Sequence, residues 1–455
     1  MPLRATFRGG VHPEEHKELT CHKPIETLPP PDVVVVPLRQ HLGAPAKAVV
    51  EVGHRVAEGQ PIGEAQGFVS VPVHAPIAGE VTAVGPHAHP GGFLCESVTL
   101  KALPASNGDE GGTPWPPPPW RLANPQPDYM GASPDVLKAL IRDAGLVGMG
   151  GAAFPTHVKL SPPPKKPVDT LIINGAECEP FLTCDHRTML EDTEAVVHGV
   201  RIMQRVLGVG RVVVGVEENK PDALDVLSRA FAPFGDVQVV ACRVKYPQGA
   251  EKQLIDALTG RQVPPPPGLP MDVGVVVQNV GTAAAVARAV MEGVPFIERV
   301  ITVSGPVVRR PANLRVRLGT PVTAVVEACD GLSEPAGKVI MGGPMMGVAQ
   351  ADLTVPVVKA TSGFVFFSRR DVDTIVPYPC IHCGRCVEAC PLGLQPSEIA
   401  LRVEVADLDA AEELHIAECM ECGSCSYICP SSRWLVQSIR LGKARLHERK
   451  QQSVT

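Results

Sequence analysis

The sequence predicts a multidomain α/β protein with an all-β unit at the N-terminus, a larger α/β sandwich, a small β-grasp module and a C-terminal α-helical domain. Three observations predict this division. Two cysteine-rich runs lie between residues 380 and 430. Ahead of them, helix-type and strand-type patterns alternate from about residue 129, which is typical of a largely parallel sheet covered by helices. Before that alternation, short apolar runs separated by glycine and proline indicate a β-rich unit.

Composition narrows the class of protein. The chain has 455 residues, of which 44% are hydrophobic, enough for several cores. Its net charge of −6 and its 4% of aromatic residues give neither the positive field nor the stacking surfaces that nucleic-acid binding requires. No stretch approaches the roughly 20 apolar residues of a membrane-spanning helix, and the first residues lack the apolar core of a signal peptide. We expect any membrane association to be peripheral and to depend on partners.

The first predicted domain covers residues 1–103 and begins with an extended, polar arm over residues 1–32. Short strands are expected at residues 33–36, 49–53, 56–62 and 73–81. This pattern resembles the lipoyl/biotinyl carrier hammerhead, a barrel-sandwich hybrid. A carrier needs a lysine on its exposed hairpin, but none lies between Lys47 and Lys101, and Gly67 and Phe68 stand near the expected position. We therefore expect a non-acylated domain that docks or braces.

A proline-rich linker is predicted over residues 104–127. Its segment Trp115-Pro116-Pro117-Pro118-Pro119-Trp120 favours stiff polyproline II geometry. The expectation is that it separates domains and does not pack into a core.

The α/β domain is predicted over residues 128–296. Ser133 is a good N-cap for a helix that runs through Leu137, Leu140 and Ile141. The other helices are expected at residues 191–207, 221–231, 251–258 and 282–291, and the strands at 168–173, 212–216, 237–241 and 273–278. A β-grasp module with connecting strands is expected over residues 297–368. Its strands are predicted at 300–305, 314–319, 338–341, 355–358 and 364–367, with a helix at 322–329.

The cluster domain is predicted over residues 369–435. Its two runs have the same spacing, Cys380-x-x-Cys383-x-x-Cys386-x-x-x-Cys390-Pro391 and Cys419-x-x-Cys422-x-x-Cys425-x-x-x-Cys429-Pro430. This spacing ligates two [4Fe–4S] clusters, with the fourth cysteine of each run bound to the other cluster. The expected ligands are Cys380, Cys383, Cys386 and Cys429 for the first cluster, and Cys419, Cys422, Cys425 and Cys390 for the second. The alternative is a pair of zinc sites, but zinc is usually bound by separated pairs of ligands.

Thiolate ligands need a reducing compartment, so the chain is expected in the cytosol. After the clusters, residues 436–455 are predicted to form a basic C-terminal helix with Arg440, Lys443, Arg445 and Arg449. Such a helix could contact an acidic partner or lipid headgroups, or it could simply face solvent.

A glycine-rich stretch in the α/β domain suggests a cofactor site. Residues 148–156 read Gly-Met-Gly-Gly-Ala-Ala-Phe-Pro-Thr, and Lys159 follows. Glycines allow backbone amides to approach an anion or a flat ring closely. Three further polar stretches begin at Asn174, Tyr246 and Gln278, each just after a predicted strand. The ends of strands are where an open α/β sheet binds ligands, although the glycine spacing is not that of the GxGxxG dinucleotide fingerprint.

Together these stretches resemble the NADH-binding flavoprotein subunit of respiratory complex I. They match its pattern as Gly-x-Gly-Gly-Ala-x-Phe-Pro-Thr…Lys, Asn-x-x-Glu-x-Glu-Pro, Tyr-x-x-Gly-x-Glu and Asn-Val-x-Thr. With the hammerhead before them and the ferredoxin-like double cluster motif after them, residues 7–445 resemble the RnfC family. This family provides the C subunit of the ion-translocating Rnf complex, which exchanges electrons between ferredoxin and NAD.

The resemblance implies the cofactors and their positions. FMN is expected near Gly148, Gly150, Gly151, Lys159, Asn174, Asn279 and Thr282. A nicotinamide nucleotide, NAD(H), is expected near Phe154, Glu179, Tyr246 and Glu251. Glu177 is counted with the cofactor-binding residues, although Glu177 and Glu179 could instead cap a helix and Tyr246 could belong to a core. Four positions depart from the complex I pattern, namely Met149, Ala153, Ala176 and Ala250, so the nucleotide site has fewer polar anchors.

The resemblance further implies an NAD(H)-linked oxidoreductase subunit of a translocase, peripheral on the cytoplasmic side of the bacterial inner membrane. Its partners would be the other subunits of that complex and ferredoxin or a ferredoxin-like subunit. A flavin is the group that joins hydride transfer to one-electron transfer. Two alternatives remain: a cobalamin reductase, whose family lacks the hammerhead in this position, and an adaptor that relays electrons through clusters without a flavin.

Overall fold

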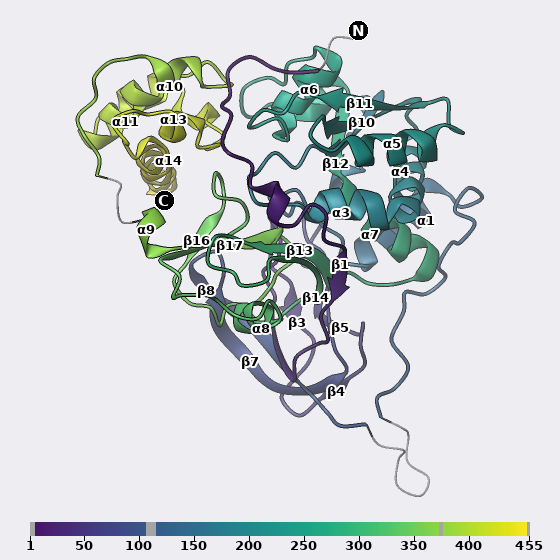
Figure 1. The fold of residues 1–455 in the computed structure, drawn as a ribbon. Coiled ribbons are helices and arrows are strands. Elements are labelled where there is room, and N and C mark those ends of the chain that lie inside the picture. Colours follow the sequence, from purple (N-terminus) through teal and green to yellow (C-terminus); the bar gives the residue numbers. More distant parts are fainter. Residues whose placement is uncertain (1–4, 106–114, 373–375, 453–455) are drawn as a thin grey trace, which may run out of the picture.

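The computed structural model describes residues 5–105, 115–372 and 376–452 (Figure 1). The predicted arm and basic helix each extend into residues outside these ranges, namely 1–4 and 453–455, and the linker includes residues 106–114, which also lie outside them. In Figure 1 the α/β domain and the C-terminal helical domain lie on either side of the N-terminal arm, above the β-rich parts.

The N-terminal β unit consists of two small sheets with a shared core. One sheet has the order β2-β8-β7-β4 and the other β3-β5-β6. The strands are β2 (Val33–Pro37), β3 (Lys47–Ala48), β4 (Arg55–Val56), β5 (Pro61–Glu64), β6 (Val73–His74), β7 (Gly79–His89) and β8 (Phe93–Ala102). Val34, Val36, Ile62, Val81 and Leu100 are buried in the core between them. The short apolar runs therefore fold as a sandwich, as the resemblance to a hammerhead predicts. The strand expected at residues 49–53 is wrong, because Val52 and Gly53 lie in a turn between β3 and β4.

The α/β domain has a parallel sheet of order β11-β10-β9-β12. Its strands are β9 (Thr170–Gly175), β10 (Arg211–Glu217), β11 (Val237–Cys242) and β12 (Val275–Asn279). The helices are α1 (Pro134–Asp143), α2 (Thr156–Lys159), α3 (Cys184–Glu191), α4 (Thr193–Leu207), α5 (Pro221–Phe231), α6 (Glu251–Thr259) and α7 (Val280–Glu292), with the 3₁₀ turn η2 (Pro270–Val273). Ser133 caps α1 by accepting from Val136 N, as expected. The prediction missed α3, because its residues are mostly polar and carry no clear apolar period.

The order in which the chain adds strands reverses between β9 and β12, although these two strands are parallel. From β9 the chain proceeds to β10 and β11 on one side and then returns to β12 on the other. Asn174 at the carboxyl end of β9 is the register partner of Asn279 at the carboxyl end of β12. Such a switch point opens a crevice at the carboxyl edge of the sheet, where ligands bind.

The β-grasp region belongs to a six-stranded sheet of order β1-β14-β13-β17-β15-β16 among the described residues. Its strands are β1 (Ile25–Thr27), β13 (Glu298–Ser304), β14 (Ala312–Arg317), β15 (Lys338–Met341), β16 (Val348–Gln350) and β17 (Gly363–Phe367), and its helix is α8 (Val322–Glu327). The strand expected at residues 355–358 is wrong. Val355 and Val357 are buried, but this segment forms only an isolated bridge, from Pro356 to Pro321, because its apolar side chains fill the core from an irregular backbone.

The C-terminal domain is helical. It contains α9 (Arg369–Val372), α10 (Arg385–Glu388), α11 (Pro396–Glu404), α12 (Leu408–Glu413), η3 (Ile416–Glu418), α13 (Ser424–Tyr427) and α14 (Leu435–Gln452). Ile399 and Val403 of α11 pack with Ile439 and Leu446 of α14. The basic residues of α14 largely pair within the domain: Lys443 Nζ lies 2.6 Å from Glu421 Oε1, and Arg449 bonds Asp409 and Glu412 at 2.7 and 2.9 Å. These pairs leave little of its charge for a partner.

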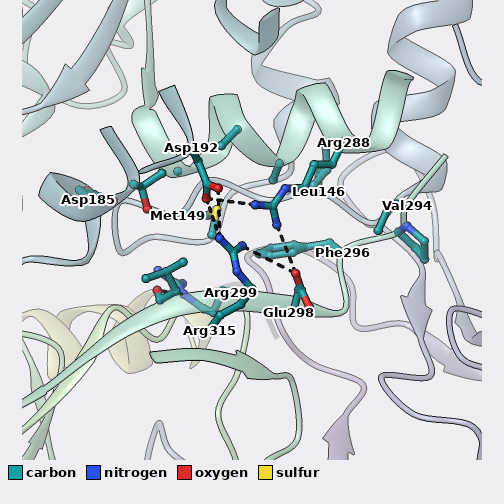
Figure 2. A pocket seen from close by; sticks show the side chains of 16 residues that line it. Leu146, Met149, Asp185, Asp192, Arg288, Val294, Phe296, Glu298, Arg299 and Arg315 are labelled. Atoms are coloured by element: carbon teal, nitrogen blue, oxygen red, sulfur yellow. Dashed lines mark hydrogen bonds and ion pairs between the residues drawn. The ribbon is translucent and has the colours of Figure 1, made fainter. Parts of the chain in front are cut away.

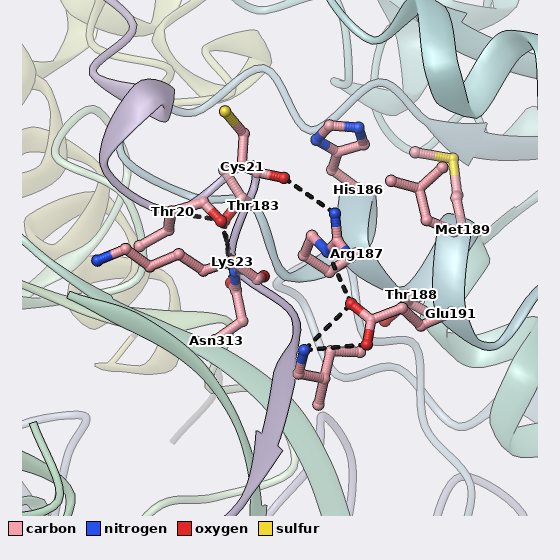
Figure 3. Close-up of polar contacts among 12 residues, drawn as sticks. Thr20, Cys21, Lys23, Thr183, His186, Arg187, Thr188, Met189, Glu191 and Asn313 are labelled. Atoms are coloured by element: carbon pink, nitrogen blue, oxygen red, sulfur yellow. Dashed lines mark hydrogen bonds and ion pairs between the residues drawn. The ribbon is translucent and has the colours of Figure 1, made fainter.

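The N-terminal arm crosses three parts of the molecule. Ala5 forms a bridge to Cys242 at the edge of the parallel sheet, and Val11 forms one to Tyr246. After the 3₁₀ turn η1 (Lys17–Leu19), strand β1 pairs in parallel with β14. Figure 3 shows this part of the arm: Thr20 Oγ1 lies 2.7 Å from Thr183 Oγ1, and Asn313 Nδ2 donates to Thr20 O at 3.0 Å. The arm is therefore a structural strap.

The described part of the linker also packs, which corrects the expectation of a free spacer. Trp120 N donates to Glu58 O and Leu122 N donates to Gly293 O. Trp120 packs against the main core, and Leu122 is buried within it. The proline-rich sequence sets the path of the backbone, but the two tryptophans and Leu122 are apolar enough to be covered by neighbouring domains.

Candidate functional site

The glycine-rich loop is a tight hairpin that leaves its outer face open. Gly148 N donates to Phe154 O at 2.8 Å, and Met149 N donates to Thr282 Oγ1 at 2.9 Å. A methyl group built on Gly150 would approach only Asn279 Cβ, at 3.7 Å, and one built on Gly151 would meet nothing within 4 Å. Gly151 has a φ of +113°, which favours glycine. The loop therefore offers bare backbone to a ligand.

The two asparagines at the switch point hold the loops around this opening. Asn279 Oδ1 accepts from Gly281 N and Thr282 N at 2.8 and 3.3 Å and so caps α7. Asn174 Nδ2 donates to Gly249 O at 2.8 Å, and its Oδ1 accepts from Ala176 N at 3.1 Å. Asn174, Asn279 and Thr282 thus fix the shape of the site through backbone contacts.

A buried carboxyl group adjoins Asn279 and was not predicted. Asn279 Nδ2 donates to Asp185 Oδ2 at 2.6 Å. Burial, and then the nearby Glu177 carboxylate, raise the pKa of Asp185 well above its ordinary value. Glu177 itself accepts from Asp185 N and His186 N at 2.7 and 3.1 Å. It therefore caps α3, which is the alternative to cofactor binding that the sequence analysis left open for this residue. The only sequence signal for Asp185 is its place shortly after the Glu-x-Glu-Pro stretch.

Lys159 and Glu251 form an ion pair beside the opening. Lys159 Nζ lies 2.6 Å from Glu251 Oε1 and also donates to Val277 O at 2.9 Å. The Glu251 side chain is 38% exposed, so it can still contact a solute. The structure thus brings together two residues that the sequence analysis assigned separately, one to FMN and one to the nucleotide.

Two of the residues expected at the nucleotide are engaged elsewhere. Glu179 accepts from Met345 N and Met346 N at 3.0 and 2.8 Å, which ties the α/β domain to the turn between β15 and β16. Tyr246 is 2% exposed and donates its hydroxyl to Cys422 O at 2.6 Å. Both side chains therefore lie at contacts between domains, while half-buried Phe154 stays on the glycine-rich hairpin.

The hammerhead braces the same loop from outside. Leu42 N donates to Ala153 O at 3.3 Å, and His157 Nε2 lies 3.1 Å from Phe68 O. Phe68 stands near the position where the sequence analysis expects a carrier to have its lysine, and this residue is 64% exposed. The expectation that this domain docks or braces agrees with these contacts.

A buried lysine in the arm supports the loop after β9, and no sequence signal singled it out. Lys17 Nζ donates to Glu177 O, Glu179 O and Leu182 O at 2.7, 3.0 and 2.7 Å. Burial, with the nearby positive charge of Lys220, lowers the pKa of Lys17. A single ammonium group thereby satisfies three carbonyls of the segment that follows Asn174.

A cavity of about 50 Å³ separates this site from the β-grasp sheet. Figure 2 shows its ion pairs: Asp192 lies 3.0 Å from Arg288 and 2.8 Å from Arg315, and Arg288 also lies 3.2 Å from Glu298. Asp192 and Glu298 both have basic partners, so the network joins α4 and α7 to β13 and β14. Met149 and Asp185 also line the cavity, which places the back of the glycine-rich loop against this junction.

The residues present fit a flavin mononucleotide at the opening. Among the described residues, no atom lies within 4 Å of a methyl group built on Gly151. A flat ring can therefore approach the backbone of residues 148–151. The N-terminus of α7, a helix of 13 residues, begins beside it at Val280, and such a terminus favours a phosphate group. Lys159 adds a positive charge at the same edge.

The cysteines of the two runs line two separate cavities. One cavity is lined by Cys390, Cys419, Cys422 and Cys425. The other is lined by Cys380, Cys383, Cys386 and Cys429. Each cavity therefore takes one cysteine from the opposite run, as expected for two cubane clusters. Burial, which disfavours an uncompensated thiolate, raises the pKa of Cys419 to about 11, so a cation beside this thiol would favour its ionisation.

Comparison with known proteins gives the family. The Nuo51 FMN-binding domain model matches residues 141–288, the RnfC barrel sandwich hybrid domain residues 5–102, the SLBB domain residues 300–349 and the 4Fe-4S dicluster domain residues 373–430. The chain is 46% identical, over 96% of its length and 93% of the relative, to the C subunit of the proton-translocating ferredoxin:NAD(+) oxidoreductase complex of Clostridium ljungdahlii. The chain belongs to the RnfC family.

Two other relatives also match this chain over most of its length. Identity is 43% over 97% of both chains to the C subunit of the Na(+)-translocating ferredoxin:NAD(+) oxidoreductase complex of Acetobacterium woodii. It is 43% over 98% of this chain and 85% of the relative to the C subunit of the ion-translocating oxidoreductase complex of Rhodobacter capsulatus. A solved NAD+-reducing [NiFe]-hydrogenase in the H2-reduced state shares the fold over 70% of this chain and 63% of its own, with a TM-score of 0.51 and 20% identity.

Proposed function

We propose that this chain is the peripheral electron-transfer subunit of an ion-translocating complex and passes electrons between NAD(H) and ferredoxin with FMN and two [4Fe–4S] clusters. The observation that carries the proposal is the 46% identity to the Clostridium ljungdahlii relative over almost the full length of both chains. Ion translocation itself belongs to the partner subunits.

The chain's own residues would form one flavin site and two cluster sites. FMN, when bound, exchanges a hydride with a nicotinamide and single electrons with a cluster. The bare backbone of Gly148, Gly150 and Gly151 would lie under the ring, and the N-terminus of α7 with Lys159 would hold the phosphate. Thr282 would hold the glycine-rich loop through Met149 N, and Asn279 would hold the N-terminus of α7. Asn174 would hold the neighbouring loop through Gly249 O.

The nucleotide site is proposed at the open rim of the same crevice. Phe154 and Glu251 are half-buried or partly exposed there. Glu251 can accept hydrogen bonds from ribose hydroxyls or from the carboxamide. Tyr246 and Glu179 no longer belong to this proposal, because their polar atoms are engaged at domain contacts.

The two cysteine quartets differ in position. Cys422 of the second quartet contacts Tyr246 of the α/β domain. Around the first quartet, Tyr378, Ile381 and Trp434 are 64%, 65% and 59% exposed, and Cys383 is exposed as well. We propose that the second-run cluster lies nearer the flavin and that the partner protein docks over the first, where apolar surface remains uncovered.

We also propose that the subunit is held on the cytoplasmic face of the membrane by its partners. None of the helices in the described ranges combines the length and apolar character that crossing a bilayer requires. The cysteine ligands need a reducing compartment, which supports the cytoplasmic side.

Anaerobic purification of the chain, followed by cofactor analysis and a reductase assay, tests the function. We expect one FMN and about eight iron atoms per chain, because two cubane ligand sets are present, and NADH-dependent reduction of an artificial acceptor. Clusters without flavin would instead support the adaptor alternative. Reduction of cobalamin as the best acceptor would support the cobalamin reductase alternative.

Glu251→Gln tests the nucleotide site. Losing a hydrogen bond to a charged group costs about 1.5–3 kcal/mol, so the KM for NADH should rise roughly ten- to a hundredfold while FMN stays bound. Glu194→Gln, at a side chain that is 92% exposed on α4, serves as the control and should leave the KM unchanged. Unaltered NADH kinetics in Glu251→Gln would remove this residue from the site.

A further inference from the structure

A four-residue segment of the α/β domain contacts both cofactor regions. Tyr246 donates its hydroxyl to Cys422 O at 2.6 Å, and Cys422 lines the cavity of the second quartet. Gly249, three residues later, accepts from Asn174 Nδ2 at 2.8 Å and donates its N–H to Cys178 Sγ at 3.2 Å. Residues 246–249 therefore reach from a cluster ligand to the switch point of the sheet.

The tyrosine end of this segment is fixed on several sides. Its backbone N donates to Val11 O at 2.9 Å, and its O accepts from Val11 N at 2.8 Å. Its ring packs with Val11, Ala389 and Cys422 in one small buried cluster. The hydroxyl bond lies in an environment from which water is excluded, where a hydrogen bond is electrostatically stronger than in water.

The middle of the segment carries an amide without a partner. Gln248 is fully buried, at 0% exposure, and within the described ranges neither Nε2 nor Oε1 makes a hydrogen bond. A buried unsatisfied amide is costly and calls for a group that completes it. Gln253, on the first turns of α6, donates to Pro391 O at 3.5 Å, and its Oε1 is likewise unpartnered. Pro391 follows Cys390 and lines the second-quartet cavity.

We infer that Tyr246 and Gln253 are positioning residues for the second-run cluster, through their hydrogen bonds to Cys422 O and Pro391 O, and that together they raise the reduction potential of that cluster. The inference rests on the proposed function, which places a cluster in this cavity. The O–H of Tyr246 neutralises the negative end of the Cys422 carbonyl, so the extra negative charge of a reduced cluster is better tolerated there. The amide N–H of Gln253 acts on the Pro391 carbonyl in the same way.

The test is a redox titration of the purified chain followed by electron paramagnetic resonance, with chemical reductant and mediators in place of NADH. Tyr246→Phe and Gln253→Leu should each lower the midpoint potential of the second-run cluster. A tenfold shift in the ratio of reduced to oxidised cluster corresponds to about 59 mV for a one-electron couple. The first-run cluster and the FMN content should not change. Tyr378→Phe, a tyrosine 64% exposed near the first quartet, is the matched control and should shift neither cluster.

Each outcome either supports or overturns the inference. Loss of the second-run cluster alone, with FMN and the first-run cluster retained, also supports a positioning role. Unchanged potentials in both variants, or an equal shift of both clusters, would overturn the inference. Because the titration uses no NADH, a failure of the proposed NADH reaction leaves this measurement intact. If either variant misfolds, as judged by loss of FMN and of both clusters, the other decides the result by the same criteria.

Discussion

Gly150 illustrates how one residue can decide whether a flavin fits. Its backbone has a conformation open to any residue, and a methyl group built on it would meet only Asn279 Cβ, at an ordinary 3.7 Å. A larger side chain would therefore occupy the space outside the loop without forcing the chain itself apart. In the proposed site, that space belongs to the ring of FMN.

Gly150→Val should therefore fold normally and lose FMN. The expected flavin content is below a tenth of the wild-type value, measured by absorbance of released flavin after denaturation. Gly210→Val is the control, since Gly210 also has free space around it and follows the end of α4, away from the loop. Full FMN in Gly150→Val would move the flavin to another part of the domain.

At this scale the sequence predicts which residues surround the proposed site, and the structure shows which groups their side chains contact. Motif spacing identified Asn174, Asn279 and Thr282, yet their polar atoms bond to backbone and shape the cradle. Tyr246 and Glu179 were predictable as members of a pattern, but their partners lie 176 and 166 residues away along the chain. Lys17 carried no local signal, because its three acceptors are carbonyl groups.

At the scale of elements, the Glu179 side chain holds the turn between β15 and β16 by hydrogen bonds. This carboxylate accepts from two backbone N–H groups of the turn, and burial raises the pKa of Glu179 to about 7 despite those bonds. Below about pH 4.5 the carboxyl is protonated in both the folded and the unfolded chain. Between about pH 4.5 and about 7 the unfolded chain loses this proton first, so the contribution of Glu179 to stability falls as the pH rises.

Glu179→Gln should remove that dependence. We expect the stability of the wild-type chain, relative to the variant, to decrease by roughly 1–3 kcal/mol between pH 4.5 and pH 7. The measurement is the melting temperature of both proteins across this range. Glu194→Gln, whose side chain is solvent-exposed, should follow the wild-type curve. A constant difference between wild type and Glu179→Gln across the range would show that Glu179 keeps an ordinary titration.

Strong periodicity made most elements of the α/β domain predictable. Helix α5 (Pro221–Phe231) has the expected bounds, and the strands of the parallel sheet agree within a few residues. The misses have physical reasons. Helix α3 is mostly polar, and Glu177 caps it from the preceding loop. Residues 355–358 are apolar because they are buried, and not because they pair in a sheet.

Across the whole molecule, the crossed arrangement of the two cysteine quartets makes the cluster domain one unit. Cys390 from the first run lines the cavity of Cys419, Cys422 and Cys425. Cys429 from the second run lines the cavity of the first. The spacing of the runs predicted this arrangement, whereas the contact between Cys422 and the α/β domain depends on tertiary packing and could not be predicted.

Cys390→Ser should remove the second-run cluster. Iron should fall from about eight to about four atoms per chain, and the remaining cluster should have the same spectrum as the one left by Cys425→Ser. Cys386→Ser should leave the other cluster. Cys95→Ser, a cysteine outside both quartets, should keep all the iron. A Cys390→Ser spectrum that matches Cys386→Ser would reverse the assignment.

The N-terminal strap has a consequence for how the molecule is made. Strand β1 needs Asn313, Leu314 and Arg315 as its partners, and Gly10 N needs Ala389 O. On the ribosome the first residues leave the exit tunnel long before these partners exist, although domains generally fold in order of synthesis. The arm therefore cannot complete its contacts until residue 389 has emerged. Completion of the strap is in this sense a late assembly step that joins the N-terminal arm to the cluster domain.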